Sequence, residues 1–157
     1  MLKKEALHGV LPIYKPKGIT STDVTRKLKP FLRKQKIGHV GTLDPLAEGV
    51  LPIVLGRACR LQDFMLDLPK TYECEVKLGQ ETTTLDAEGE VIACCPYQHV
   101  SLPALQKAAK SMLGQQVQTP PLYSAIKHKG KKLYQYAREH GSSSVVDLKK
   151  LQRKIYI

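Results

Sequence analysis

Long apolar runs are missing from this 157-residue sequence, in which hydrophobic residues make up 42% of the chain but fall in short stretches. No run approaches the roughly 18 residues that a membrane-spanning helix needs. The N-terminal stretch MLKKEALHGV is basic and contains neither a long apolar segment nor a small-residue cleavage site, so it does not predict a secretory signal. We therefore expect a cytoplasmic protein with no membrane partner, and the length suits a single domain with a real core.

Motifs for metal binding and for several common catalytic classes are missing as well. The four cysteines, Cys59, Cys74, Cys94 and Cys95, form no CxxC pair, whereas zinc ligands must be spaced so that they converge on one ion. The sequence also has no HExxH, no Walker-type loop and no Ser/His/Asp arrangement around a nucleophile elbow. It predicts reduced thiols and no metal site.

Acidic residues are few, since 14 Asp and Glu stand against 25 Lys and Arg and give a formal charge of +11. The excess is uneven: residues 1–36 carry ten basic and two acidic side chains, and residues 125–157 carry nine and two. Residues 37–124 carry six basic and ten acidic side chains. Two basic ends around an acidic middle favour surfaces that bind a polyanion such as nucleic acid, although a basic soluble protein without such a partner has the same composition.

The pattern of apolar and turn residues mixes strands and helices without strict alternation, which is typical of an α+β fold with a mainly antiparallel sheet. Thr20 or Ser21 can cap a helix that Pro30 kinks or ends, and Thr71–Leu78 has the clearest strand alternation. The other expected elements are strands at Gly9–Tyr14, Val50–Leu55, Glu90–Ala93 and Arg153–Ile157, helices at Ala58–Leu66, Ser101–Leu113 and Leu133–His140, a hairpin turning at Lys129–Gly130, and a flexible link at Gly141–Ser144.

The segment Gly38–Gly49, GHVGTLDPLAEG, holds three glycines, one proline, one histidine and one aspartate, and it predicts an ordered loop between two apolar strands. Pro45 restricts the backbone of Asp44 to extended conformations, and Gly38 and Gly41 let a ligand approach the backbone closely. One carboxylate and one imidazole on a firmly held loop favour catalysis. A tight turn with a capping aspartate explains the same residues equally well.

Several motifs resemble those of one enzyme family. GHVGTLDPLAEGVLPIVLGRA resembles the signature of the TruB family of tRNA pseudouridine synthases, whose core is GHxGxLDPxAxGxLP. Lys15–Gly18 resembles the KPxG motif of that family, and Lys70–Tyr72 followed by Leu78-Gly79 resembles its K-x-Y…LG strand. Pro120–Ala137 (PPLYSAIKHKGKKLYQYA) resembles its P-x-YSA-x-K-x-x-G-K-x-LY-x-YA segment. These motifs cover nearly the whole chain in the family's order and resemble the bacterial stand-alone members more than the guide-RNA-dependent ones.

The resemblance implies a mixed α/β pseudouridine-synthase fold around an antiparallel sheet. It implies the isomerisation of a uridine in the T-arm loop of tRNA, at tRNA position 55, without metal or organic cofactor. The family's catalytic aspartate falls on Asp44, the histidine that helps to hold the splayed loop falls on His39, and the tyrosine that packs against the target base falls on Tyr72. Gly38, Gly41 and Asp86 fall on supporting positions. The cations expected to hold the tRNA backbone are Lys15, Lys17, Lys127, Lys129, Lys131 and Lys132.

Two features depart from the family pattern. LGxxTDTxDxxG becomes LGQETTTLDAEG at Leu78–Gly89, where Asp86 matches and Thr83 replaces an aspartate. Family members continue beyond Tyr156-Ile157 with a segment containing SKGTYIR, whose arginine pairs with the catalytic aspartate, and many add a PUA domain. The sequence therefore predicts a partial catalytic domain over residues 1–157 that turns over little or no uridine alone, and a monomer for the complete enzyme with no identified protein partner. The alternative is an RNA-binding fragment or remnant that holds tRNA without chemistry.

Overall fold

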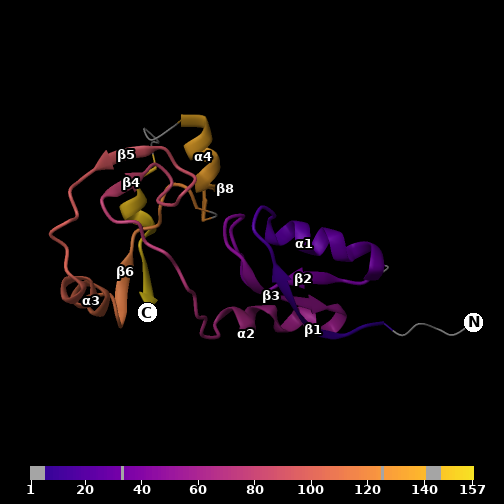
Figure 1. The fold of residues 1–157 in the computed structure, drawn as a ribbon. Coiled ribbons are helices and arrows are strands. Elements are labelled where there is room, and N and C mark those ends of the chain that lie inside the picture. Colours follow the sequence, from indigo (N-terminus) through magenta and orange to yellow (C-terminus); the bar gives the residue numbers. More distant parts are fainter. Residues whose placement is uncertain (1–5, 33, 125, 141–145) are drawn as a thin grey trace, which may run out of the picture. The chain divides into compact units, whose positions relative to one another are not determined.

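The computed structural model describes residues 6–32, 34–124, 126–140 and 146–157. The chain divides into two compact units, Met1–Glu73 and Cys74–Ile157, each with its own strands and helices (Figure 1). The sequence alone predicts one partial domain and gives no sign of this division. The flexible link expected at Gly141–Ser144 lies outside the described residues.

A three-stranded antiparallel sheet forms the centre of the first unit, in the order β1-β3-β2. Strand β1 (Gly9–Lys15) pairs along its whole length with β3 (Gly49–Leu55), and β2 (Ile37–His39) pairs with the far end of β3. The strands expected at Gly9–Tyr14 and Val50–Leu55 are confirmed. Strand β2 was not expected, because its last two residues belong to the stretch predicted to be a loop.

Two prolines limit this sheet. Pro12 of β1 lies opposite Pro52 of β3 in the register, and neither has an N–H to donate. The carbonyl of Pro52 faces β2 and accepts a hydrogen bond from the Val40 N–H at 2.9 Å. Pro52 cannot return the second bond that an antiparallel pair would exchange there. The pairing of β2 therefore ends at His39, and the chain leaves the sheet for the loop that carries Asp44.

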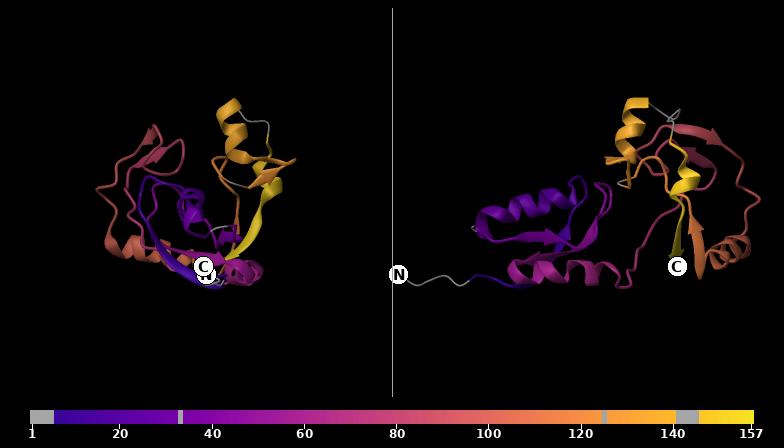
Figure 2. Two further views of the ribbon diagram at one scale, coloured as in Figure 1. Left: turned by 90° about the vertical axis from the view of Figure 1, so that its right-hand side faces the viewer. Right: turned by 180° about the vertical axis from the view of Figure 1, so that it is seen from behind.

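Helix α1 (Ser21–Leu28) runs alongside the sheet in each view (Figure 2). Its N-cap is Thr20, which forms a capping box with Asp23, so the predicted start is confirmed. After Leu28 the chain tightens into a 3₁₀ turn, η1 (Lys29–Leu32), at the proline expected to end the helix. Five buried residues of α1, η1 and β3 form the core between helix and sheet: Val24, Leu32, Leu51, Ile53 and Leu55.

The residues that follow β3 in the chain cover its opposite face. Residues Gly56–Leu61 form a 3₁₀ helix, η2, and Gln62–Leu66 form α2, so the helix predicted at Ala58–Leu66 is confirmed with a 3₁₀ first half. Val54 is fully buried on this face. Its register partner in β2 is Gly38, where an added Cβ would stand 3.0 Å from the side-chain oxygen of Gln62. The close approach that glycine allows here is thus used by the protein's own α2.

The strand predicted at Thr71–Leu78 is wrong for this structure. Residues 71–77 pair with no strand of the described chain, and the side chains of Tyr72 and Val76 are 68% and 73% exposed. Alternating side chains specify two faces, but a strand also needs a neighbour for its N–H and C=O groups. The alternation could not show whether that neighbour is present.

Among the described residues, the second unit consists of short antiparallel pairs and three helical segments. Strand β4 (Gln80–Thr82) pairs with β5 (Val91–Cys94), β6 (Gln115–Gln118) with β9 (Arg153–Tyr156), and β7 (Lys127–His128) with β8 (Lys131–Lys132). The helical segments are α3 (Leu102–Ser111), α4 (Leu133–His140) and η4 (Leu148–Leu151). The strands expected near Glu90–Ala93 and Arg153–Ile157 and both helices are confirmed, with Ser101 capping α3.

The hairpin between β7 and β8 turns at Lys129-Gly130, as predicted, and both residues have positive φ, 47° and 82°. A two-residue turn with positive φ at both central residues matches the right-handed twist of the two strands that it connects. Every strand pair among the described residues is antiparallel, which confirms the α+β class. None of the described helices is long and apolar enough to cross a bilayer.

Candidate active site

The loop of residues 40–48 carries Asp44 from the end of β2 to the start of β3. Asp44 opens a turn in which its carbonyl accepts a hydrogen bond from the Ala47 N–H at 3.0 Å. Pro45 occupies the second position of that turn, where its fixed φ is favoured, and aspartate is favoured at the first. The residue types at 44 and 45 therefore specify the turn that presents Asp44.

The same loop is tied on both sides of Asp44 to the segment that leads into α1. The Ser21 hydroxyl accepts from the Leu43 N–H at 2.9 Å and donates to the Leu43 carbonyl at 3.0 Å. On the other side, the Gly18 N–H donates to the Pro45 carbonyl at 2.8 Å. The backbone at Asp44 is thus held by contacts whose partners lie more than twenty residues earlier in the chain.

The side chain of Asp44 is exposed. Among the described residues, no side-chain hydrogen bond and no ion pair involves its carboxylate. Both carboxylate oxygens are therefore available to a ligand, although the backbone that carries them is fixed.

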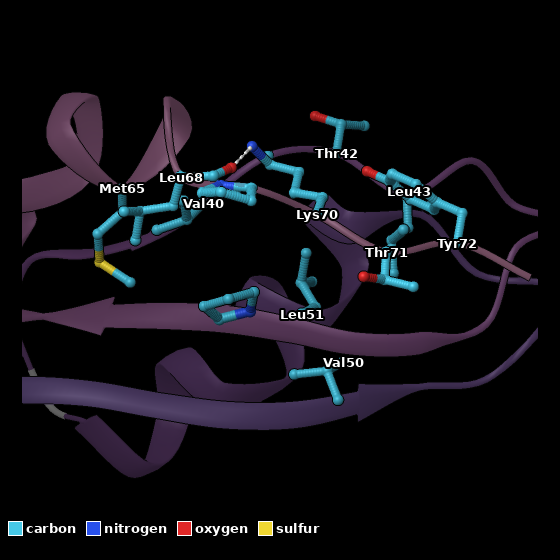
Figure 3. A pocket seen from close by; sticks show the side chains of 13 residues that line it. Val40, Thr42, Leu43, Val50, Leu51, Met65, Leu68, Lys70, Thr71 and Tyr72 are labelled. Atoms are coloured by element: carbon cyan, nitrogen blue, oxygen red, sulfur yellow. Dashed lines mark hydrogen bonds between the residues drawn. The ribbon is translucent and has the colours of Figure 1, made fainter. Parts of the chain in front are cut away.

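An apolar hollow of about 280 Å³ lies within the first unit (Figure 3). Leu43, the residue before Asp44, forms part of its wall, and Tyr72 forms another part. Lys70 also lines the hollow, and its ammonium donates hydrogen bonds to the carbonyls of Leu66, the last residue of α2, and of Leu68. The remaining wall residues are Val40, Gly41, Thr42, Val50, Leu51, Pro52, Met65, Leu68, Pro69 and Thr71. The structure thus brings Leu43, the sequence neighbour of the predicted Asp44, and the predicted Tyr72 to one hollow.

His39 ends β2 at the base of the loop and is half-buried. Its Nδ1 lies 2.5 Å from the Gly41 carbonyl, so this nitrogen carries the proton and donates it. Gly41 has φ 73°, a left-handed conformation that suits glycine, and an added Cβ there would meet nothing within 4 Å. The backbone bond sets the orientation of the ring and leaves Nε2 outside that bond.

The two N-terminal lysines of the predicted RNA surface differ sharply. Lys15 is fully buried, and its ammonium donates to the carbonyls of Pro16 at 3.0 Å and Ile19 at 2.8 Å. Its burial argues against the predicted phosphate contact, because the ammonium shapes the turn before α1 instead. Lys17 is exposed and lies 3.6 Å from Glu48.

Glu48 also accepts a hydrogen bond from the hydroxyl of Tyr14 at 2.8 Å. This bond to a carboxylate raises the pKa of the Tyr14 hydroxyl. Tyr14 and Glu48 thus join β1 to the end of the loop that carries Asp44.

The hairpin lysines lie in the second unit and also differ from one another. Lys129 occupies the turn and is exposed. Lys131 forms an ion pair with Glu139 of α4, and its ammonium lies 5.0 Å from the centre of the Tyr136 ring. Lys132 is half-buried, with its ammonium 5.6 Å from the centre of the Tyr134 ring.

Asp86 and Thr83 lie together in the turn between β4 and β5. The Asp86 carboxylate accepts from the Thr84 hydroxyl at 2.5 Å and from the Glu88 N–H at 2.9 Å. Thr83 donates its backbone N–H to the Glu90 carbonyl at 2.9 Å. In this structure Asp86 stabilises its own turn, and the threonine that replaces the family's aspartate contributes its backbone to the same turn.

No cluster of three or more His, Cys, Asp or Glu side chains that could hold a metal ion occurs in the described part of the chain. The four cysteines are free thiols.

Comparison with known proteins decides the family. Residues 29–157 match the family model described as TruB family pseudouridylate synthase (N terminal domain). The chain belongs to the TruB family. Among similar proteins, tRNA pseudouridine synthase B of Listeria welshimeri is 47% identical over 132 residues, which cover 84% of this chain and 43% of that protein. The proteins of the same name from Bacillus subtilis and Geobacillus kaustophilus are 45% and 48% identical over 133 residues, or 43% and 47% of their lengths. The chain thus spans less than half the length of these relatives.

The match to the TruB family covers only part of the site. Asp44, His39 and Tyr72 lie inside the matched residues 29–157, whereas Gly18 and Ser21, which hold the loop, lie before them. From the sequence, Ser21 was predicted only as a possible helix cap. Its signal was present, since Thr20 can cap the helix and form a capping box with Asp23, which leaves the neighbouring hydroxyl without a local function.

Proposed function

We propose that this chain provides the catalytic aspartate of a tRNA pseudouridine synthase that acts on the uridine of the T-arm loop at tRNA position 55. One observation carries the proposal: the exposed Asp44 carboxylate, unpaired among the described residues, stands on a fixed loop beside an apolar hollow whose wall includes Tyr72. Membership of the TruB family and the relatives named tRNA pseudouridine synthase B support the reaction and the substrate.

The reaction is an isomerisation in which atoms balance without a cofactor. The bond from N1 of uracil to C1′ of the ribose breaks, the uracil rotates, and a bond from C5 to C1′ forms. C5 loses its proton and N1 gains one. A carboxylate can assist by attacking the base or the sugar, or as a base in forming a glycal, and each route requires an ionised and oriented carboxylate next to the nucleotide.

The hollow suits the uracil that must leave its stack. Side chains reach a base only after it is turned out of the helix or loop, which costs stacking energy. An aromatic ring against the extruded base returns about 1–3 kcal/mol, and Tyr72 is the aromatic residue on the wall. A volume of about 280 Å³ is at the small end of ligand pockets, which begin at roughly 300 Å³, so it favours a single base.

The remaining residues are proposed to hold the RNA around that base. His39 can offer Nε2 to the splayed loop because its other nitrogen is fixed by Gly41. Phosphates attract exposed cations, and Lys17 and Lys129 are exposed. Lys15 is not included, because it is fully buried.

The test is release of tritium from C5-labelled uridine in a T-arm stem-loop under single-turnover conditions, by a TruB-family protein of the relatives' full length that carries this chain. Asp44→Asn keeps the shape of the side chain and removes its charge, so we expect release to be abolished. RNA affinity should stay within about tenfold, or roughly 1.4 kcal/mol. Asp63→Asn is the matched control, since it neutralises another exposed carboxylate of the same unit.

Turnover by Asp44→Asn at the rate of the unchanged chain would exclude Asp44 as the catalytic group. RNA binding without tritium release by the unchanged chain would favour a module that holds tRNA without chemistry.

A further inference from the structure

Ser21 has a buried hydroxyl that forms two hydrogen bonds, both to one distant residue. Its residue exposure is 2%, and its oxygen both accepts from and donates to the backbone of Leu43, at 2.9 and 3.0 Å. A hydroxyl offers one donor and two acceptor sites. Both bonds therefore converge on the single residue that precedes Asp44.

The usual reason for a serine at this place in a helix does not apply. Serine near a helix start commonly caps the free N–H groups, but Thr20 performs that task by accepting from the Asp23 N–H at 3.1 Å. In return, the Asp23 carboxylate accepts a hydrogen bond from the Thr20 N–H at 3.0 Å. Ser21 is thus the first residue of α1 and contributes nothing to the cap.

We propose that Ser21 is a positioning residue for Asp44, acting through the backbone of Leu43; the catalytic part of this inference rests on the proposed function. Because Ser21 fixes both the N–H and the carbonyl of Leu43, it fixes the peptide plane that leads into Asp44. The Gly18 N–H fixes the carbonyl of Pro45 on the other side at 2.8 Å. Between these two ties, the backbone sets the direction of the Asp44 Cα–Cβ bond without using either carboxylate oxygen.

The consequence for the reaction is orientation rather than affinity. A carboxylate that reacts must stay close to its productive position, and small displacements cost rate. RNA affinity comes from phosphate contacts and base stacking elsewhere. Loss of the Ser21 hydroxyl should therefore lower the rate of reaction in the bound complex and leave the RNA affinity nearly unchanged.

The variant is Ser21→Ala, and Thr20→Ala is the matched control, each made in a TruB-family protein of the relatives' full length that carries these 157 residues. Both variants remove one hydroxyl from the start of α1, but only Ser21→Ala breaks the bonds to Leu43. Two measurements follow for each: amide hydrogen exchange at Leu43, and single-turnover tritium release at saturating T-arm RNA with a separate binding titration. A urea unfolding curve for each variant shows that both are compared in the folded state.

For Ser21→Ala we expect exchange at Leu43 to rise by about tenfold, as loss of hydrogen bonds of ordinary strength implies. We expect the rate at saturating RNA to fall by about tenfold, with the RNA dissociation constant within about twofold. Thr20→Ala should leave exchange at Leu43 and the saturating rate unchanged.

Unchanged exchange at Leu43 in Ser21→Ala would overturn the inference. So would raised exchange with an unchanged rate, since Ser21 would then hold the loop without affecting Asp44. If the unchanged full-length protein releases no tritium, the proposed function fails and takes the catalytic part of this inference with it, while the exchange result still decides whether Ser21 holds the loop.

Discussion

The three hairpin lysines should contribute unequally to RNA binding, and single Lys→Gln variants can show it. Lys129 is exposed in the turn, whereas the ammonium of Lys131 is paired with Glu139 and rests over Tyr136. Lys132 has no carboxylate within ion-pair distance among the described residues and lies over Tyr134. We therefore expect Lys129 and Lys132 to meet phosphates and Lys131 to contribute less.

The magnitude follows from counterion release. Each phosphate contact adds about 0.7–0.9 to the slope of log affinity against log salt. Over a fourfold rise in salt, one contact therefore costs about threefold in affinity. Lys129→Gln and Lys132→Gln should each flatten the slope by about that unit, and Lys131→Gln by less than half of it. Glu139→Gln should steepen the slope, because it frees the charge of Lys131.

Fluorescence anisotropy with a labelled T-arm stem-loop measures this, with titrations at four salt concentrations between about 50 and 200 mM. Lys110→Gln on α3 is the control for a general change in net charge. Equal slopes for Lys129→Gln and Lys131→Gln would refute the argument from the Glu139 pair. An unchanged slope in all three variants would place the RNA surface away from the hairpin.

Two further predictions concern Asp23 and Tyr72. Hydrogen bonds from the hydroxyl and then the backbone of Thr20 lower the pKa of Asp23 below its ordinary value of 3.8. The ionised Asp23 therefore stabilises the folded state fully above pH 3.8, and this stabilisation is lost as the pH falls through the lowered pKa of the folded state. Urea unfolding midpoints should lose this acid dependence in Asp23→Asn, and the same pH profile in both proteins would contradict the capping box. Tyr72→Leu should reduce kcat/KM for tritium release by about 5- to 150-fold, which corresponds to the loss of about 1–3 kcal/mol of stacking. Tyr72→Phe keeps the ring, so its kcat/KM should stay close to that of the unchanged protein. Equal losses in both variants would point to the hydroxyl instead of the ring.

Local signals predicted the elements that depend on local contacts. The start of α1 follows from a threonine and an aspartate three residues apart, which satisfy one another's backbone groups. The hairpin turn at Lys129-Gly130 follows from a glycine where positive φ is needed. These residues lie next to their partners in sequence, so the pattern contains all of the relevant interaction.

Pairings between distant segments could not be predicted in the same way. Strand β2 lies inside a glycine-rich stretch because β3 offers it backbone groups, and it ends where Pro52 fails to return a bond. Strand β6 has a polar sequence, QQVQ, and is a strand because β9 pairs with it. Conversely, Thr71–Leu78 has the right alternation and no partner among the described residues. The sheet partner decides these cases, and periodicity does not reveal it.

The candidate site shows the same limit at the level of single side chains. Asp44, His39 and Tyr72 were predicted by resemblance, and in the structure Leu43, the residue before Asp44, lines one hollow together with Tyr72. Lys15 shows where sequence reasoning failed, because a lysine in a KPKG turn predicts an exposed cation, yet its ammonium donates to two carbonyls in the interior. Burial is set by the packing of the whole unit, and lysine is rarely fully buried.

The loop around Asp44 separates the groups that hold it from the group that would react. In the described residues, the hydrogen bonds that fix Leu43, Asp44 and Pro45 all use backbone atoms on the loop side. A carboxylate held by its own oxygens would have to exchange those bonds before it could meet a substrate, whereas one held through its backbone keeps both oxygens ready. Only the two side-chain torsions of Asp44 then remain to be set, and under the proposed function the bound uridine would set them.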